Sequence, residues 1–308
     1  MLSDSTLSVK ELLKYARKRL GDSSLPDDDA FELLEAFTGL DRQSVYFSGD
    51  AAITQENREA FLKALDKRCE HYPLQYIIGC WYFMGMRLKV EEGVLCPRDD
   101  TEVLVREAAR LAELLSKERY AEKKADALCK ESLCSVALHG VDLCSGTGCV
   151  ALGMAEICEN VSITAVEKFD IPFECLSENI SRYGGGRVTA VREDVLSENA
   201  VKGFSSLDFI VSNPPYIKLG DMDTLQEEVK HEPREALTDF SDGLTFYRFI
   251  VKYWKYSLRK GGFVAFEIDD SQAEAVRGLL IENGFEKIHV LKDIGGLERC
   301  VSAFLADD

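Results

Sequence analysis

The apolar and polar positions of this 308-residue chain follow two different periodicities. In the N-terminal part, apolar residues recur at helical spacing in three segments separated by short polar loops. Ser8 with Glu11, and Asp29 with Glu32, have the spacing of helix-capping boxes, and Gly39 stands where the second segment should end. The pattern predicts a small helical bundle. Its three segments are residues 8–20, 29–38 and 54–71.

The rest of the chain alternates between strand-like and helix-like segments. Residues 81–90 alternate between apolar and polar positions, and Gly85 near their middle predicts a hairpin. Short apolar runs then alternate with helical segments, which is typical of an α/β sheet with parallel strands, here closed by an antiparallel pair. The expected strands are residues 136–143, 161–166, 188–191, 203–211, 263–268, 288–291 and 300–305. The expected helices are residues 101–115, 149–158, 246–258 and 271–283.

These patterns predict three parts with different roles in the fold. We expect a helical domain at residues 1–78, a hairpin linker at 79–95 and a sheet domain at 96–308. The charged stretch 116–131 is most simply a solvated helix end and loop. Residues 217–232 are polar and poorly periodic, and could form a flap over a site.

The segment with the most distinctive chemistry is Asn213-Pro214-Pro215-Tyr216, after the apolar run 207–211. Proline disfavours the helical conformation in the preceding residue and has no N–H, so nearby carbonyl groups stay free to point into a site. The side-chain oxygen of Asn213 and a neighbouring carbonyl can accept both N–H bonds of a planar NH2 group, and Tyr216 offers a flat face. The segment indicates a site that holds an NH2 group while its nitrogen attacks an electrophile. The alternative is a proline-stiffened turn.

A second segment, rich in small residues, links the strand at 136–143 to the following helix. Small residues at such a turn let a ligand approach the backbone and the helix N-terminus, which indicates a nucleotide-type site. The spacing is not that of the dinucleotide fingerprint, because Gly146-x-Gly148 is followed by Ala151. The full turn reads Asp142-Leu143-Cys144-Ser145-Gly146-Thr147-Gly148.

Acidic residues follow the next two expected strands. Glu167 follows the strand at 161–166, where a carboxylate can accept both ribose hydroxyls. Asp194, followed by Val195, comes after the strand at 188–191 and is placed for an adenine edge. Each carboxylate taken singly is most simply a solvated surface group. At successive strand ends they favour an adenosyl ligand, because open α/β sheets bind ligands outside the carboxyl ends of their strands.

Further short segments lie outside these two sites. They are Pro73-Leu74-Gln75-Tyr76-Ile77-Ile78-Gly79, Leu95-Cys96-Pro97-Arg98-Asp99-Asp100-Thr101-Glu102, Glu232-Pro233 with Ala236-Leu237, Gly243-Leu244, and the pairs Glu267 with Gln272 and Asp293 with Arg299. With the two site segments, they resemble class I S-adenosylmethionine-dependent methyltransferases, and more closely the HemK-type release factor glutamine N5-methyltransferases. The likeness extends over most of the chain. Three positions depart from the family pattern, since Asp99 replaces a proline and Cys144 and Asp269 replace glycines.

The resemblance implies a seven-stranded, Rossmann-like α/β methyltransferase domain with a helical substrate-docking domain joined by a β-hairpin. It implies S-adenosyl-L-methionine as cofactor and, as acceptor, the glutamine of the Gly-Gly-Gln motif in bacterial peptide chain release factors. The catalytic residues would be Asn213, Pro214, Pro215 and Tyr216. The cofactor-binding residues would be Asp142, Cys144, Ser145, Gly146, Thr147, Gly148, Glu167, Asp194, Val195 and Asn213.

The composition of the chain bears on its substrate class and on the compartment in which it acts. The net charge is −17 and there is no Lys/Arg-rich run, which argues against a free nucleic-acid substrate. The ten cysteines form no Cys-x-x-Cys pair and no signal peptide is seen, so we expect free thiols, Cys129 and Cys134 among them, and a cytoplasmic protein. The four histidines are scattered, so no metal is expected. No apolar stretch is long enough to predict a membrane span.

Two other functions stay open at this point. One is an amino-methyltransferase that acts on adenine in DNA or RNA, or on glutamine in another protein such as a ribosomal protein. The other is a non-catalytic module that binds S-adenosylmethionine or a release factor without turnover. The acidic balance weighs against the nucleic-acid substrate, and the complete Asn-Pro-Pro-Tyr segment weighs against a module without activity.

Overall fold

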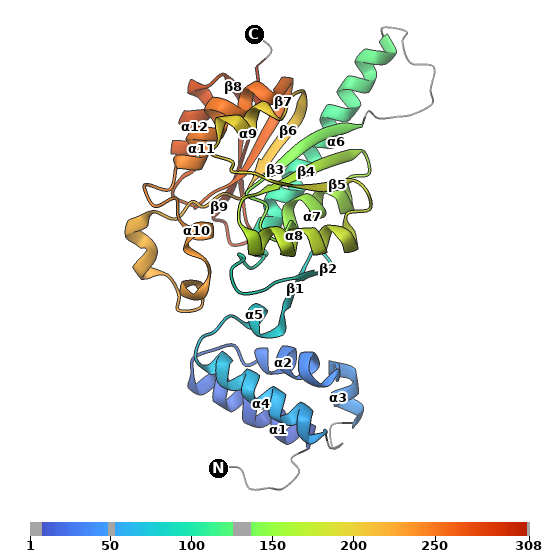
Figure 1. Cartoon of the computed structure of the whole chain (residues 1–308), viewed down its shortest axis with the longest axis vertical. Coiled ribbons are helices and arrows are strands. Elements are labelled where there is room, and N and C mark those ends of the chain that lie inside the picture. The colour runs from blue at the N-terminus through green and yellow to red at the C-terminus, as the bar shows by residue number, and fades with distance from the viewer. Residues whose placement is uncertain (1–7, 49–52, 126–136, 307–308) are drawn as a thin grey trace. The chain divides into compact units, whose positions relative to one another are not determined.

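The computed structural model describes residues 8–48, 53–125 and 137–306 of the chain. The chain forms two compact units (Figure 1). One comprises Met1–Cys80 together with Leu225–His231, and the other comprises Trp81–Thr224 and Glu232–Asp308. The start of the strand expected from Val136, the 126–131 part of the charged stretch, Cys129 and Cys134 lie outside the described residues.

The first unit is a helical bundle, as the apolar periodicity predicts. Its core consists of large aliphatic and aromatic side chains that are fully buried, among them Leu12, Leu33 and Phe61. The capping box at Ser8 and Glu11 is present, and Gly39 ends its helix with a left-handed φ of 73°. The helices are α1 (Val9–Asp22), α2 (Asp29–Thr38), α3 (Arg42–Ser48), α4 (Gln55–Cys69) and α5 (Leu74–Ile78), with the 3-10 turn η2 (Val229–His231).

The second predicted capping box, at Asp29, is wrong. Asp28 is the residue that precedes the helix, and its side chain makes no capping hydrogen bond. The Asp29 carboxylate instead accepts a hydrogen bond from Arg68 Nε at 2.7 Å. Arg68 is buried, and its Nη2 also donates to Glu228 Oε1 at 2.7 Å. A buried guanidinium needs carboxylate partners, and this requirement outweighs the local capping preference of Asp29.

The second unit contains a seven-stranded sheet, which confirms the expected α/β fold. The strand order is β5-β4-β3-β6-β7-β9-β8, and the pairs from β5 to β7 are parallel whereas β9 pairs antiparallel with β7 and β8. The strands are β3 (Leu138–Leu143), β4 (Val161–Glu167), β5 (Val188–Arg192), β6 (Leu207–Ser212), β7 (Leu258–Glu267), β8 (Phe285–Lys292) and β9 (Glu298–Leu305). The predicted hairpin is also present, as β1 (Cys80–Phe83) and β2 (Met86–Lys89) with Gly85 in its turn.

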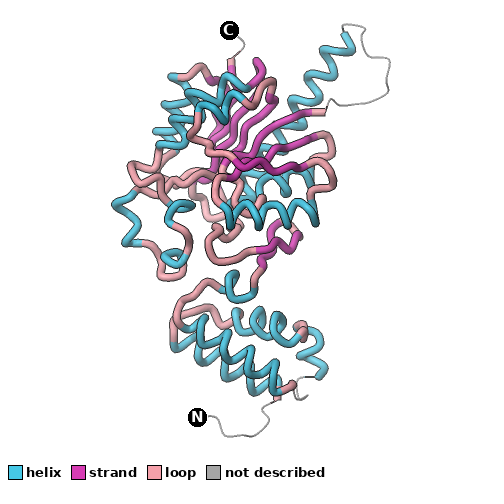
Figure 2. Tube along the Cα trace, in the orientation of Figure 1, coloured by secondary structure: helices cyan, strands magenta, loops and turns pink. Residues whose placement is uncertain are grey.

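Helices cover both faces of this sheet, and each face has its own apolar core (Figures 1 and 2). The first core contains residues of α6 (Thr101–Ala125), α7 (Cys149–Ile157) and α8 (Asp170–Tyr183). The second core contains residues of α9 (Glu198–Lys202), α11 (Thr245–Tyr253) and α12 (Ala273–Glu282). The short elements η1 (Leu219–Thr224), α10 (Arg234–Leu237) and η3 (Trp254–Ser257) complete the unit. Coverage of both faces explains why the central strands are continuous apolar runs.

Several element boundaries differ from the expected ones, and two of these differences have a clear physical reason. Helix α6 continues to Ala125 instead of ending at residue 115, because the charged tail can extend a helix through pairs such as Glu113 with Lys117. Gly261 and Gly262 lie inside β7 rather than in a turn before it. A side chain at 262 would come within 2.9 Å of the Asp208 carbonyl oxygen, so glycine allows close approach of β6. Among the described residues, no helix has the length and apolar character required to cross a membrane.

The buried Arg68 generates a stability prediction for the helical unit. Replacing Arg68 with Met should lower its free energy of unfolding by about 3 kcal/mol, because Asp29 would remain buried without its cation. Arg19→Met is the matched control, since the Arg19–Asp66 pair is partly exposed and should contribute less than about 1 kcal/mol. Hydrogen exchange of the α2 and α4 amides would measure both. Equal losses in the two variants would contradict this account of Arg68.

Candidate functional site

The ends of four neighbouring parallel strands bring the predicted site segments to one edge of the sheet. Leu143, the last residue of β3, pairs with Val166 of β4 and with Ser212 of β6. Glu167 at the end of β4 pairs with Arg192 of β5. The residues that follow these strands therefore emerge together, and they include the turn after β3, Asp194 after β5 and Asn213 after β6.

The turn between β3 and α7 is tightly held by its own hydrogen bonds. The Ser145 hydroxyl donates to the carbonyl oxygen of Asp142 at 2.7 Å, and its backbone N–H donates to the carbonyl of Val166 at 3.1 Å. Gly148 has a φ of 83°, and a Cβ there would lie 2.5 Å from a Leu176 methyl group, so only glycine fits. Cys144 adopts a left-handed φ of 62°, where a side chain is strained by about 1 kcal/mol relative to glycine.

Asp142 supports the turn from inside the fold and is not among the residues that line the cavity described below. Its side chain is only 1% exposed, and its Oδ2 accepts a hydrogen bond from the N–H of Ala151, in the first turn of α7. Burial raises the pKa of this carboxyl to about 7. The side chain thus anchors the N-terminus of α7, a position from which it sets the shape of the turn.

Glu167 accepts three backbone hydrogen bonds on its two carboxylate oxygens. The donors are Gly146 N at 3.0 Å, Lys168 N at 2.7 Å and Phe169 N at 2.9 Å. A carboxylate has about four lone-pair sites, so acceptor capacity is left for a ligand hydroxyl. Glu167 therefore connects the turn after β3 to the segment after β4.

Asp194 and Val195 line the same cavity from the end of β5. Asp194 accepts a hydrogen bond from Leu196 N at 2.9 Å and forms an ion pair with Lys168 Nζ at 3.0 Å. Val195 is 3% exposed, and its carbonyl accepts the indole N–H of Trp254 at 2.9 Å. These contacts fix the segment after β5 from both sides.

The Asn-Pro-Pro-Tyr segment follows β6, and its members point in different directions. Asn213 and Pro215 line the cavity, whereas Pro214 and Tyr216 do not. The Asn213 amide donates from Nδ2 to Thr101 Oγ1 at 3.4 Å, which leaves its side-chain oxygen as an acceptor. The Tyr216 hydroxyl donates to Glu267 Oε1 at 3.2 Å, and the Tyr216 carbonyl accepts from Gln272 Nε2 at 2.9 Å. Two hydrogen bonds therefore hold the segment at Tyr216, and one holds the Asn213 amide.

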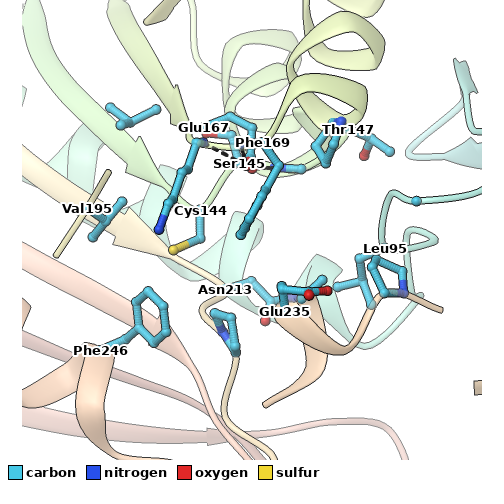
Figure 3. Close-up of a pocket in the computed structure, with 18 of the residues that line it drawn as sticks. Leu95, Cys144, Ser145, Thr147, Glu167, Phe169, Val195, Asn213, Glu235 and Phe246 are labelled. Atoms are coloured by element: carbon cyan, nitrogen blue, oxygen red, sulfur yellow. Dashed lines mark hydrogen bonds between the residues drawn. The ribbon is translucent and has the colours of Figure 1, made fainter. Parts of the chain in front are cut away.

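A single cavity of about 700 Å³ unites these segments. Figure 3 shows Val195 and Phe246 on one side of it and Leu95 and Thr147 on the other, with Asn213 and Glu235 between them in this view. The volume lies in the range of small-molecule sites. Its charged lining is mainly acidic, with five carboxylates and two cations, and comprises Glu167, Asp170, Asp194, Glu235, Asp239, Arg98 and Lys168. Such a lining suits a ligand that carries positive charge.

Several lining residues were not singled out as site residues from the sequence. Lys168 and Phe169 follow Glu167 directly and Ile171 comes two residues later, so the signal for them in the sequence is their place after a strand end. Phe246 is far from the other site residues in sequence, and spacing offers no signal for it. Pro233 and Ala236 lie in a segment on which the family resemblance rests, without a role there. Arg98 and Thr101 lie in a segment that the family resemblance had marked, without a role.

Glu267 is a buried carboxyl next to this cavity and is only 2% exposed. Burial raises its pKa to about 7, although hydrogen bonds from the hydroxyls of Thr101 and Tyr216 act in the opposite direction. Asp100 raises the pKa further and Arg299 lowers it. Among the described residues, no group of His, Cys, Asp and Glu side chains has the arrangement of a metal site.

The raised pKa of Glu267 predicts a pH-dependent effect on stability. Because the pKa of Glu267 in the folded state exceeds its ordinary value, the folded state keeps this proton between about pH 4.5 and 7, whereas the unfolded state loses it. The stabilising effect of the bound proton is therefore lost as pH rises through this window. Relative to Glu267→Gln, wild type should therefore lose up to about 3 kcal/mol between pH 4.5 and 7, with no further loss above pH 8. Urea unfolding of both proteins at several pH values tests this. A pH-independent difference would contradict the raised pKa.

Comparison with known proteins places the chain in a family. Residues 11–79 match the family described as PrmC N-terminal domain, and residues 123–240 match the methyltransferase small domain. A release factor glutamine methyltransferase of Clostridium botulinum is 34% identical over 277 residues, which cover 89% of this chain and 90% of the relative. The Bacillus subtilis protein of the same name is 32% identical, over 97% of this chain and 98% of its own.

A solved structure extends the comparison to the fold. The catalytic domain of hMettl16, crystallised with a MAT2A 3′UTR hairpin, aligns with a TM-score of 0.54 at 13% sequence identity, over 90% of this chain and 93% of that one. At this identity the likeness supports the methyltransferase-type fold alone. The relatives in sequence are more specific, because they match over nearly their full length. The chain therefore belongs to the release factor glutamine methyltransferase family.

Proposed function

We propose that this protein transfers a methyl group from S-adenosyl-L-methionine to the side-chain amide nitrogen of the glutamine in the Gly-Gly-Gln motif of bacterial release factors. The observation that carries the proposal is Asn213 at the cavity, whose amide N–H2 is turned toward Thr101 and whose oxygen is free to accept. Family membership supports the choice of a release factor as substrate. Because release factors act in translation, we assign the reaction to the cytoplasm.

The cavity residues fit the cofactor by their chemistry. Glu167 has acceptor capacity left for ribose hydroxyls, and Val195 and Phe169 offer apolar surface for an adenine ring. The mainly acidic lining suits the positive charge of a sulfonium. When bound, the cofactor supplies an electrophilic methyl group.

Asn213 would orient the acceptor rather than remove its proton. The lone pair of an amide nitrogen is delocalised, so the nitrogen is a weak nucleophile and must be aimed. The Asn213 oxygen would accept one N–H bond of the glutamine amide. The carbonyl of Pro214, which stands in the chain between the lining residues Asn213 and Pro215, would accept the other. Among the described residues none donates a hydrogen bond to that carbonyl. Two acceptors on the N–H bonds favour positive charge as it develops on nitrogen.

The balance of the reaction requires no strong base. The amide nitrogen would form the new bond to the methyl carbon while the carbon–sulfur bond breaks, and the electron pair of the broken bond would stay on sulfur. The methylated nitrogen then releases one proton to solvent. Positioning can supply much of the rate enhancement, since good alignment of the reactants can lower the activation barrier by roughly 7–11 kcal/mol. Tyr216 contributes through its hydrogen bonds to Glu267 and Gln272, which hold the backbone on which Asn213 stands.

Methyl transfer to a release factor tests the proposed function. The full chain with methyl-labelled S-adenosylmethionine should label an unmodified release factor and leave a Gly-Gly-Ala version unlabelled. The Asn213→Ala enzyme is the control; its kcat should fall about 10²–10³-fold while cofactor affinity changes little. Label on both substrates would refute glutamine as the acceptor. Cofactor binding without label on either would redirect the search to nucleic acids and ribosomal proteins.

The contact between Thr101 and Asn213 generates a sharper prediction. Thr101→Val removes the hydroxyl that accepts from Asn213 Nδ2, so the amide can rotate and present its N–H2 to the substrate. We expect kcat to fall about tenfold with little change in cofactor affinity. Thr101→Ser keeps the hydroxyl and should restore most of the activity. If serine fails to restore it, the loss comes from packing and the orienting role is wrong.

A further inference from the structure

A groove on the helical unit gathers positive charge in an otherwise acidic chain. Its volume is about 690 Å³, and Lys10, Lys14 and Arg17 of α1 line it together with Arg42 of α3. The rings of Phe31 and Tyr46 line it as well. The chain as a whole has 54 acidic and 37 basic residues, so such a cluster is not a consequence of composition. These six residues define the basic groove.

Three of the four cations of the basic groove lie on α1, where their mutual repulsion lowers the stability of the helix. Lys10, Lys14 and Arg17 lie on one face of α1, since residues four and three apart are neighbours on a helix. Like charges at this spacing destabilise a helix. In the part of the chain that the structure describes, no carboxylate forms an ion pair with Lys14 or Arg17. Arg42 has only long pairs, at 3.7 Å to Asp28 and 3.9 Å to Glu32.

Aromatic rings hold the two guanidinium groups in place. Arg17 and Arg42 both contact the Phe31 ring, at 5.0 Å and 4.8 Å from its centroid. Such contacts orient a guanidinium without neutralising it. Tyr46 is 79% exposed beside these cations, and its neighbour Phe47 is 75% exposed. At Lys14 and Arg17 the basic groove thus has positive charge that no carboxylate of the described residues pairs with, and Tyr46 adds exposed apolar surface.

We propose that the basic groove docks an acidic segment of the release factor, with carboxylates on its cations and an apolar side chain against Tyr46. The inference rests on the proposed function, because it takes the release factor as the partner. Charge complementarity supports this occupant. A protein of net charge −17 repels an acidic partner over most of its surface, so a local cationic groove both attracts such a partner and selects the orientation in which it approaches. A nucleic acid is less suited, because phosphate binding of useful strength takes more cations than the groove offers.

Binding of the full chain to an unmodified release factor tests the proposal. The double variant Lys14→Gln/Arg17→Gln should raise the Kd about tenfold, and the difference from wild type should shrink at high salt. The control is Lys63→Gln/Lys67→Gln, which removes two cations from α4 outside the groove and should leave the Kd unchanged. Thermal melting of each variant confirms that the fold is intact.

The readouts separate this proposal from the proposed function. Binding needs no methyl transfer, so a release factor with Gly-Gly-Ala should show the same loss in the groove variant. Methyl transfer without any effect of the groove variant on Kd would overturn the groove proposal alone. Groove-dependent binding of a single-stranded RNA in place of the release factor, or a groove-dependent dimer in sedimentation, would assign the surface to another occupant and overturn it too.

Discussion

Parallel pairing of β5, β4, β3 and β6 is the constraint on which the site depends. Since Leu143 pairs with both Val166 and Ser212, the chain leaves these strands at one edge of the sheet. The segments that follow these strands, from Cys144 to Asn213, therefore meet around one cavity. A register shift of one residue in β6 would turn Asn213 to the other face, because side chains alternate along a strand. The burial of both sheet faces under helices holds this register.

Buried polar side chains then convert the sheet edge into a shaped cavity. Asp142 anchors α7, Glu167 ties the turn after β3 to the segment after β4, and Asn179 of α8 donates to the carbonyls of Lys89 and Thr147. These groups act on backbone atoms, so they fix shape before any ligand arrives. A preformed site costs little ordering free energy on binding, and it can present acceptors to an amide at a fixed distance.

The alternation of strands and helices could be predicted from the sequence, because the spacing of apolar positions in each element reflects which of its faces are buried. The sequence also predicted the strand-end residues, since their place after apolar runs is local information. Contacts between distant segments could not be predicted in this way. The bond from Asn213 to Thr101 spans 112 positions, and Arg68 with Glu228 spans 160, so neither leaves a pattern in spacing. Asp29 was predicted wrongly for the same reason, because its partner lies 39 residues away. The basic groove likewise exists only when α1, α2 and α3 are packed together.

The central claim is that Asn213 aims a glutamine amide at the cofactor methyl group. A crystal structure of the full chain with S-adenosylhomocysteine and a Gly-Gly-Gln peptide would test it most directly. We predict the glutamine side-chain nitrogen about 3 Å from Asn213 Oδ1, with the adenosyl group between Glu167 and Val195. A glutamine bound elsewhere in the cavity, or an Asn213 amide that presents its nitrogen to the substrate, would contradict the account.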